Sequence, residues 1–277
     1  MEKIIDAVPV EDIIKELTEE RFVRKTNFGH NEIYIVNAHN APNTMREIGR
    51  LREWAFRESG GGTGKSMDID EFDTRDEAYF EQLIVWDPVE KEILGGYRFI
   101  ECNKLPVKNN GQVDTPTSEL FYYSEDFIKN YLPYTIELGR SFVQPKYQST
   151  GNVRKSIFTL DNLWDGLGAV LTQTPNAKYF FGKVTMYSQY DKALRDMILF
   201  FMHKFFPDND NLIYPYPEVA IKTKARTAIM KLRLDGDNYQ NSYRTLSKYV
   251  RENGSVIPPL FNAYMSLSAT MKMFGTA

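Results

Sequence analysis

The sequence has little of what disulfide-stabilised or metal-binding proteins use. Its 277 residues include one cysteine, Cys102, and three histidines. A single cysteine can form neither an internal disulfide nor a cysteine-cluster zinc site, so we expect a reducing compartment. His30, His39 and His203 are scattered along the chain, and we expect no metal cofactor.

Long apolar runs and excess positive charge are also missing. The longest uncharged stretch, residues 255–271, contains two prolines and is a poor membrane span. The first 16 residues carry acidic side chains and no continuous apolar core, so they predict no secretory signal. A net charge of −3 argues against a nucleic-acid partner. We therefore expect a cytoplasmic protein.

Aromatic residues are abundant, at 14% of the chain. They favour a groove that handles apolar matter, although aromatic side chains also simply fill protein cores. Phe121-Tyr122-Tyr123 and Phe205-Phe206 are two such clusters. They line a long acyl pocket or belong to the core, and the sequence leaves both interpretations open.

The hydrophobic periodicity predicts an α/β (α+β) fold with a mixed, mainly antiparallel sheet and helices on both faces. Thr44 and Glu47 predict a capping box, and Ser188 a helix cap. No linker divides the chain, so we expect one domain over 1–277, with a core at about 30–206, an N-terminal helical extension and a C-terminal extension at 207–277. The expected elements are a helix at 11–20, a strand at 32–38, a helix from Thr44, a hairpin of strands 80–86 and 93–101, a strand at 134–143, a helix at 153–171, a strand at 178–185 and a helix after Ser188.

The glycine-rich run at residues 59–66 resembles a phosphate-binding P-loop but departs from the pattern twice. Ser59 occupies the first glycine position, and the run follows a helix instead of a buried strand. We interpret it as a flexible loop that shapes or covers a site.

The segment 143–153 links the expected strand to a helix N-terminus, where free backbone amides suit a phosphate group. Its pattern V-x-P-x-Y-Q-x-x-G resembles the acyl-donor motif of GNAT acyltransferases, although Val153 replaces the usual small residue. An ordinary surface turn is the alternative. The resemblance implies a phosphopantetheine thioester donor, on acyl carrier protein or coenzyme A. We expect it to contact Phe142, Val143, Gln148, Ser149, Gly151 and Arg154.

A second pattern consists of Arg52, Phe56, Asp70, Asp73, Arg98 and the pair Glu137 and Arg140. It resembles the pattern of acyl-homoserine-lactone synthases and ornithine-lipid N-acyltransferases. The resemblance covers about 45–275, and its closest match is a group often labelled hemolysins. In that group a further segment usually follows, so we expect this chain to stop short of it. The resemblance implies acyl carrier protein as partner and transfer of a fatty acyl group to the amine of a small amino acid, which gives an N-acyl amino acid as an aminolipid precursor. Ornithine, glycine, lysine and serine are all open as the acceptor. Peripheral contact with the inner membrane face is also open. Its site residues are Arg52, Phe56, Asp70, Asp73, Arg98, Glu137 and Arg140.

An amine must lose a proton to attack a thioester, and Glu137 is our candidate for the general base. Arg140 either fixes that carboxylate or holds the carboxylate of an amino-acid acceptor. Residues three apart in a regular strand point to opposite faces. We therefore predict a β-bulge at Gly139, which brings both side chains to one site.

The remaining charged residues have two interpretations. Asp70, Asp73 and Arg98, with Arg52 beneath them, form a network that positions the acceptor or one that only rigidifies the loop. Tyr190 is our candidate for protonating the leaving thiolate. Lys146, Arg154 and Lys155 either attract an acidic carrier protein or are a solvated helix start.

Three other functions remain open at this point. The first is an acetyltransferase that uses acetyl-CoA, which needs a small acyl pocket. The second is a membrane-active protein, which the absence of a long apolar or cationic amphipathic helix disfavours. The third is a GNAT-like domain without catalysis.

Overall fold

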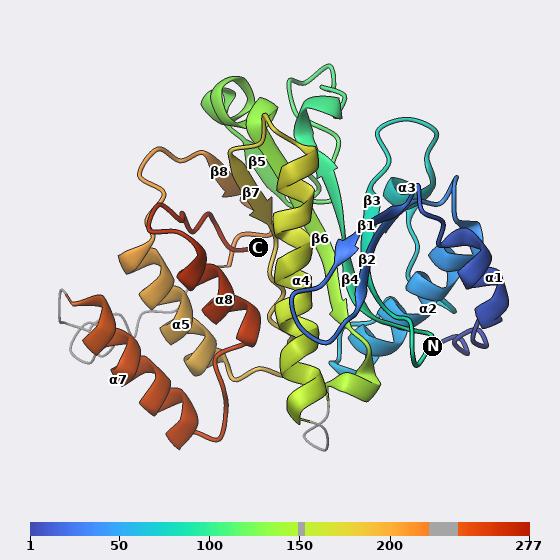
Figure 1. Ribbon diagram of the computed structural model, residues 1–277. Coiled ribbons are helices and arrows are strands. Elements are labelled where there is room, and N and C mark those ends of the chain that lie inside the picture. Colours follow the sequence, from blue (N-terminus) through green and yellow to red (C-terminus); the bar gives the residue numbers. More distant parts are fainter. Residues whose placement is uncertain (149–152, 222–237) are drawn as a thin grey trace. The chain divides into compact units, whose positions relative to one another are not determined.

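The computed structural model describes residues 1–148, 153–221 and 238–277, without the side chains of 153–160 (Figure 1). Contacts divide the chain into two compact units. Unit 1 consists of Met1–Val107 and Lys129–Lys183, and unit 2 of Lys108–Ile128 and Val184–Ala277.

Unit 1 is built on a six-stranded sheet with the order β1-β2-β3-β4-β6-β7. Neighbouring strands are antiparallel except for the parallel pair β6 and β7. The predicted mixed, mainly antiparallel sheet is therefore confirmed. The strands are β1 (Phe22–Lys25), β2 (Glu32–Val36), β3 (Glu81–Asp87), β4 (Glu92–Glu101), β6 (Thr135–Val143) and β7 (Tyr179–Gly182).

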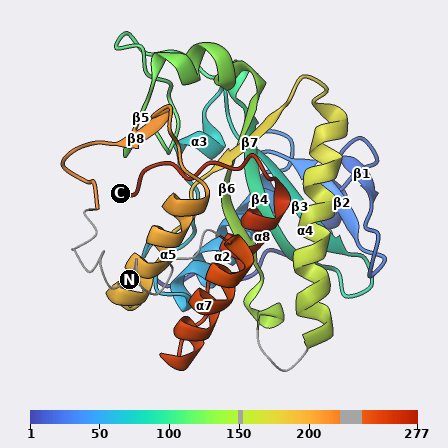
Figure 2. The same ribbon diagram turned by 90° about the vertical axis from the view of Figure 1, so that its left-hand side faces the viewer.

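Helices cover both faces of this sheet, as predicted. The helix α2 (Pro42–Glu58) packs Ile48 and Leu51 against Ile84 and Phe142. On the opposite face α4 (Val153–Gln173) packs residues such as Leu167 against the sheet. Figure 2 shows the strands β3, β4 and β6 running between the two helices. The shorter helices α1 (Val10–Glu16) and α3 (Glu71–Thr74) also belong to unit 1.

Unit 2 contains a two-stranded sheet of β5 (Phe121–Tyr123) and β8 (Ile213–Pro215). Its helices are α5 (Lys192–Phe205), α7 (Tyr239–Glu252) and α8 (Pro259–Leu267). Their apolar faces meet in one core that includes Phe201, Leu246 and Phe261.

Single helical turns at Cys102–Lys104, Phe127–Tyr131, Leu132–Tyr134 and Pro145–Tyr147 complete the described elements. No helix in the described ranges is long and apolar enough to cross a membrane.

Two predicted helix starts are wrong. Pro42 begins α2, and the amide and hydroxyl of Thr44 both donate to the Glu16 carboxylate, at 2.7 and 2.8 Å. This long-range cap replaces the predicted box, because the Glu47 carboxylate instead accepts from Arg50 and from the Val8 amide.

The helix α5 begins at Lys192, later than predicted. Asp191 is its cap, since its carboxylate accepts from the amides of Ala193 and Leu194 at 2.8 and 3.0 Å. Ser188 lies outside the helix, because an ionised carboxylate next to the first turn interacts more strongly with the helix N-terminus. The helix expected at 11–20 is shorter than predicted, because α1 ends at Glu16.

Candidate functional site

The strand β6 bulges beside its partner β4. Gly96 pairs with Phe142 and Arg98 with Gly139, so Arg140 and Ser141 together lie opposite Tyr97 alone. Arg140 has a φ of 50°, in the left-handed region. The predicted bulge is confirmed, but it lies one residue after Gly139, and the arginine itself adopts the unusual conformation.

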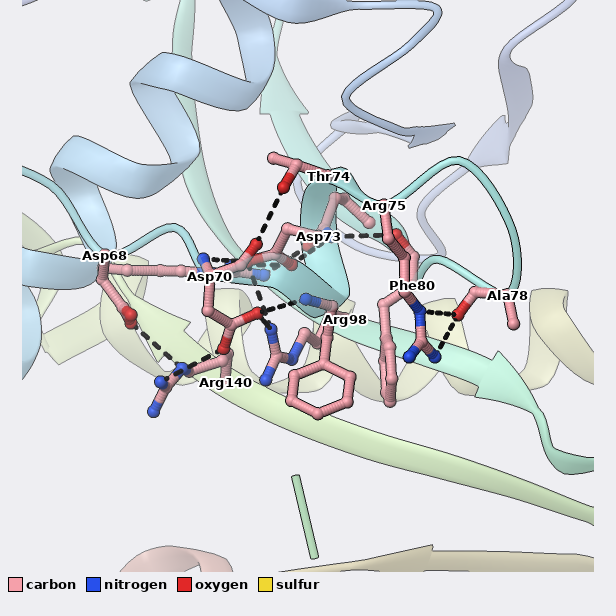
Figure 3. Close-up of polar contacts among 12 residues, drawn as sticks. Asp68, Asp70, Asp73, Thr74, Arg75, Ala78, Phe80, Arg98 and Arg140 are labelled. Carbon is pink, nitrogen blue, oxygen red and sulfur yellow. Dashed lines mark hydrogen bonds and ion pairs between the residues drawn. The ribbon is translucent and has the colours of Figure 1, made fainter. Parts of the chain in front are cut away.

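The bulge places the two predicted charged residues on one face of the sheet. Glu137 pairs with Ile100 and Gly139 with Arg98, and residues that face each other on antiparallel strands share a face. Glu137 and Arg98 therefore project to the side of α2 and α3. Arg140 reaches the same side, where its guanidinium meets the carboxylates of Asp68 and Asp70 at 3.2 and 3.5 Å (Figure 3).

Six alternating charges form what we call the charged network: Arg52, Asp68, Asp70, Asp73, Arg98 and Arg140. Asp73 contacts Arg52 at 3.2 Å and Arg98 at 3.1 Å, and Arg98 contacts Asp70 at 2.6 Å. Three carboxylates thus balance three guanidinium groups. The four residues predicted to come together, Arg52, Asp70, Asp73 and Arg98, do so.

Local structure fixes the two aspartates at the start of α3. The Asp70 carboxylate accepts from the Phe72 amide at 3.1 Å, and the Asp73 carboxylate accepts from the Asp70 amide at 3.2 Å. This capping box lets each carboxylate hold the turn and an arginine together. The rings of Phe72 and Phe80 flank the Arg98 guanidinium, with centroids 6.0 and 4.9 Å away.

Two members of this site were not predicted from the sequence. Asp68 is the ion-pair partner of Arg140. The Gln82 amide donates to Asp73 at 2.9 Å, and its oxygen accepts from Arg52. The available signal was a polar residue, Gln82, directly before the apolar run 83–86, since a buried amide requires hydrogen-bond partners.

The interior of the network is buried and its end is open. Arg52 and Asp73 are at most 1% exposed, whereas the Arg140 side chain is 36% exposed. Burial acts to raise the pKa of Asp73, but Arg52 and Arg98 outweigh it and hold that pKa below its usual value. Burial raises the pKa of Asp68, although Arg140 opposes it. Arg140 is the part of this network best placed to meet a ligand.

Glu137 lies in the middle of β6, between β4 and β7, and is 3% exposed. It neighbours Cys102, whose thiol pKa is raised well above its usual value by burial and by the charge of Glu137. A thiol in this state is a poor nucleophile, because the thiolate is the reactive form.

On the other edge of β6, pairing with β7 covers Thr135 to Leu138 and ends at Gly182 in the described chain. The strand β6 itself continues to Val143, whose carbonyl accepts from the Gln148 side chain. Phe142 is buried in the core on the α2 face. Ser149 and Gly151, and the side chains of Arg154 and Lys155, lie outside the described residues.

Other predicted residues lie as follows. Phe56 packs against the apolar cluster on the α2 face. Lys146 forms an ion pair with Glu92 at 2.8 Å. Tyr190 belongs to unit 2, where its hydroxyl donates to the Val256 carbonyl at 2.9 Å. Its role as a proton donor stays a prediction.

The glycine-rich run binds a carboxylate of the chain itself. The amides of Thr63 and Gly64 donate to Glu53, each at 2.8 Å. Burial acts to raise the pKa of Glu53, but hydrogen bonds from Thr63 and Arg57 outweigh it and lower this pKa. These amides are therefore engaged by Glu53, and the loop that we expected to be flexible is closed on α2.

Known proteins resemble this chain over its whole length. A family model described as "Acetyltransferase (GNAT) domain" matches residues 51–156. A protein of Bacteroides thetaiotaomicron named "Glycine N(alpha)-acyltransferase" is 53% identical over 100% of this chain and 81% of its own length. A protein of the same name from Phocaeicola vulgatus is 50% identical, over 100% and 84% respectively.

Among solved structures, the aminoglycoside acetyltransferase HMB0005 from an uncultured soil metagenomic sample aligns over 57% of this chain and 82% of its own. The identity is 12% and the TM-score is 0.32. The two relatives are each at least half identical over the full chain, and the domain match agrees with them. The chain therefore belongs to the GNAT N-acyltransferases and is an acyltransferase enzyme.

Proposed function

We propose that the enzyme transfers a fatty acyl group from a phosphopantetheine thioester to the α-amine of glycine, which gives an N-acylglycine. The name shared by the two relatives supports glycine among the small amino acids. The structural observation that carries the proposal is the bulge in β6, because it places the partly exposed Arg140 on the same face as the buried Glu137.

Arg140 is our candidate for the acceptor's carboxylate. Its guanidinium is anchored by Asp68 and Asp70, and the Arg140 side chain as a whole is still 36% exposed, which leaves it accessible to a ligand. A guanidinium binds a carboxylate through two parallel hydrogen bonds. Glycine held in this way has its amine close to its carboxylate, on the face where Glu137 lies.

The reaction needs one proton acceptor and one proton donor. The amine nitrogen attacks the thioester carbonyl carbon, a C–N bond forms, and the C–S bond breaks. In our proposal the Glu137 carboxylate takes the amine proton, directly or through water, and Tyr190 protonates the leaving thiolate. The buried Cys102 with its raised pKa favours direct attack over an acyl-cysteine intermediate.

The donor arm would lie along the edge of β6 beyond Leu138. Pairing with β7 ends there in the described chain, so the backbone groups of the following residues are candidates to bind the amides of an extended phosphopantetheine. We propose acyl carrier protein as the main donor and coenzyme A as the second. Lys146 contributes positive charge near this strand end, but Glu92 partly neutralises it.

A panel of substrates tests the proposal. The purified protein is incubated with palmitoyl carrier protein, palmitoyl-CoA or acetyl-CoA, and with glycine, ornithine, lysine or serine, and the products are identified by mass spectrometry. We expect N-palmitoylglycine as the main product, formed faster from the carrier protein. Acetylation without palmitoylation would instead support the acetyl-CoA alternative, and a dominant N-acylornithine would refute glycine as acceptor.

A further inference from the structure

Unit 2 contains a groove outside the site described above. None of the residues that line it has been named as catalytic or substrate-binding. We call it the α7 groove. Its volume is about 420 Å³, which falls in the range of small-molecule sites, roughly 300–1,000 Å³. One wall is the helix α7, and the other is formed by residues between 256 and 262.

The α7 wall carries a stripe of hydrogen-bond donors. Arg244, Ser247 and Arg251 all line the groove, and their spacing of three and four residues places them on one face of the helix. Within the described ranges neither arginine forms an ion pair, and Glu252, the acidic residue of α7, pairs with Lys248 instead. Arg251 is held by a bond from its Nε to the Ser247 carbonyl, at 3.2 Å.

The groove also contains a polar atom that needs a partner. The Ser247 hydroxyl is buried and makes no hydrogen bond to the described residues. Such a group costs free energy unless a ligand or water satisfies it. The opposite wall adds Asn262, whose Oδ1 accepts from the Tyr243 hydroxyl at 2.6 Å, so that its Nδ2 remains a donor.

The lining chemistry defines the ligand class. Two guanidinium groups, a hydroxyl and an amide offer donors, and none of the described residues that line the groove carries a carboxylate. Val256, Ile257 and the Tyr243 ring add an apolar side. Two positive charges on one helix face repel each other, and an anion bound between them offsets this repulsion. The fork of a guanidinium group matches the geometry of phosphate oxygens. We propose that the α7 groove binds a phosphate monoester that carries an apolar group, either a soluble ester or a lipid headgroup.

Binding of phenyl phosphate to the full chain, measured by isothermal titration calorimetry, tests this proposal. We expect saturable binding that weakens with added salt and is tighter than that of inorganic phosphate. R244Q and R251Q should each weaken it by about tenfold or more, since each removes charge-assisted hydrogen bonds. K248Q is the matched control, because it removes one charge from the same helix outside the groove, and it should change binding less than about twofold.

Two further experiments identify the source of the ligand and distinguish a loss of binding from a loss of folding. Sedimentation with vesicles containing phosphatidic acid, if lost in R244Q, assigns a lipid headgroup; binding of phenyl phosphate without vesicle binding assigns a soluble ester. R244K keeps the charge and should still weaken binding, because lysine lacks the fork. No saturable binding of either probe by the wild-type protein, or an equal loss in K248Q, overturns the proposal.

Discussion

At the scale of single residues, Asp73 is the centre of the charged network. Its carboxylate contacts Arg52 and Arg98 and accepts from Gln82, while its own side chain is 1% exposed. Removing one partner of a buried ion pair is costly, because the remaining charge stays buried without compensation. The network should therefore be sensitive to the charge of Asp73 and not only to its size.

We predict that Asp73→Asn, which keeps the size and removes the charge, lowers the free energy of unfolding by about 3–5 kcal/mol. Urea unfolding measures the change. The nearby exposed residue Asp76 supplies the control, since Asp76→Asn should alter stability by less than about 0.5 kcal/mol. Equal effects of the two variants would contradict this account of the network.

The same residue should give a pH dependence. The folded pKa of Asp73 lies below its unfolded value, so its contribution to stability is complete above the ordinary carboxyl range and disappears as the pH falls through the folded pKa. The stability gap between the wild type and Asp73→Asn should therefore be large at neutral pH and shrink in acid. Urea midpoints measured across this range test the expectation, and a gap that is independent of pH would refute it.

Arg140 is the residue where the two interpretations of the charged network separate. If it holds the acceptor's carboxylate, Arg140→Lys should raise the KM for glycine by about tenfold, because lysine cannot form two parallel hydrogen bonds. The kcat should change much less. Steady-state kinetics measures both, with Arg46→Lys on the exposed side of α2 as control. An unchanged KM would leave Arg140 with a structural role alone.

At the scale of elements, the sequence predicted well what depends on local pattern. The hairpin of β3 and β4, the strand β6 and the helices α2 and α4 follow from apolar periodicity. The bulge was predicted from the expected function. Glu137 and Arg140 are three residues apart, so they reach one site only if the strand bulges between them. The position of the bulge at Arg140 was not predicted, since backbone conformation at one residue depends on the neighbouring strand.

Long-range contacts account for what the sequence did not predict. The carboxylate that caps the first turn of α2 comes from Glu16, 28 residues before Thr44. The strand β1 is four residues long and includes Arg24 and Lys25, so it has little apolar pattern. Asp68 lies near Arg140 only because the chain folds the loop before α3 onto β6.

The closeness of β4 and β6 gives a prediction for this element pair. A Cβ added at Gly95 would lie 2.6 Å from the Phe142 carbonyl oxygen, a contact that forces the backbone to move. Gly95→Ala should lower the free energy of unfolding by about 1–3 kcal/mol. Gly168 on α4 is the matched control, because an added Cβ meets no atom within 4 Å there. Gly168→Ala should stabilise by up to about 1 kcal/mol, and thermal or urea unfolding measures both.

At the scale of the whole molecule, composition and periodicity predicted the fold class correctly, and the comparisons confirm the enzyme class. The small sheet of unit 2 was missed because β5 and β8 have three residues each and pair across about 90 residues of chain. Half of the predicted donor-binding residues lie outside the described structure or its described side chains. The single-domain organisation and the roles of the site residues stay predictions.

The central claim is that glycine is acylated on the sheet face that holds Glu137. A single-turnover reaction with palmitoyl carrier protein and ¹⁵N-labelled glycine, followed by mass spectrometry, tests it most directly. The wild-type protein should form N-palmitoylglycine that contains the label, and Glu137→Gln should form it about 10²–10⁴ times more slowly, because it cannot accept the amine proton. Glu101→Gln on the neighbouring strand should react like the wild type. The account is contradicted if labelled N-palmitoylglycine does not form, or if Glu137→Gln makes it at the wild-type rate.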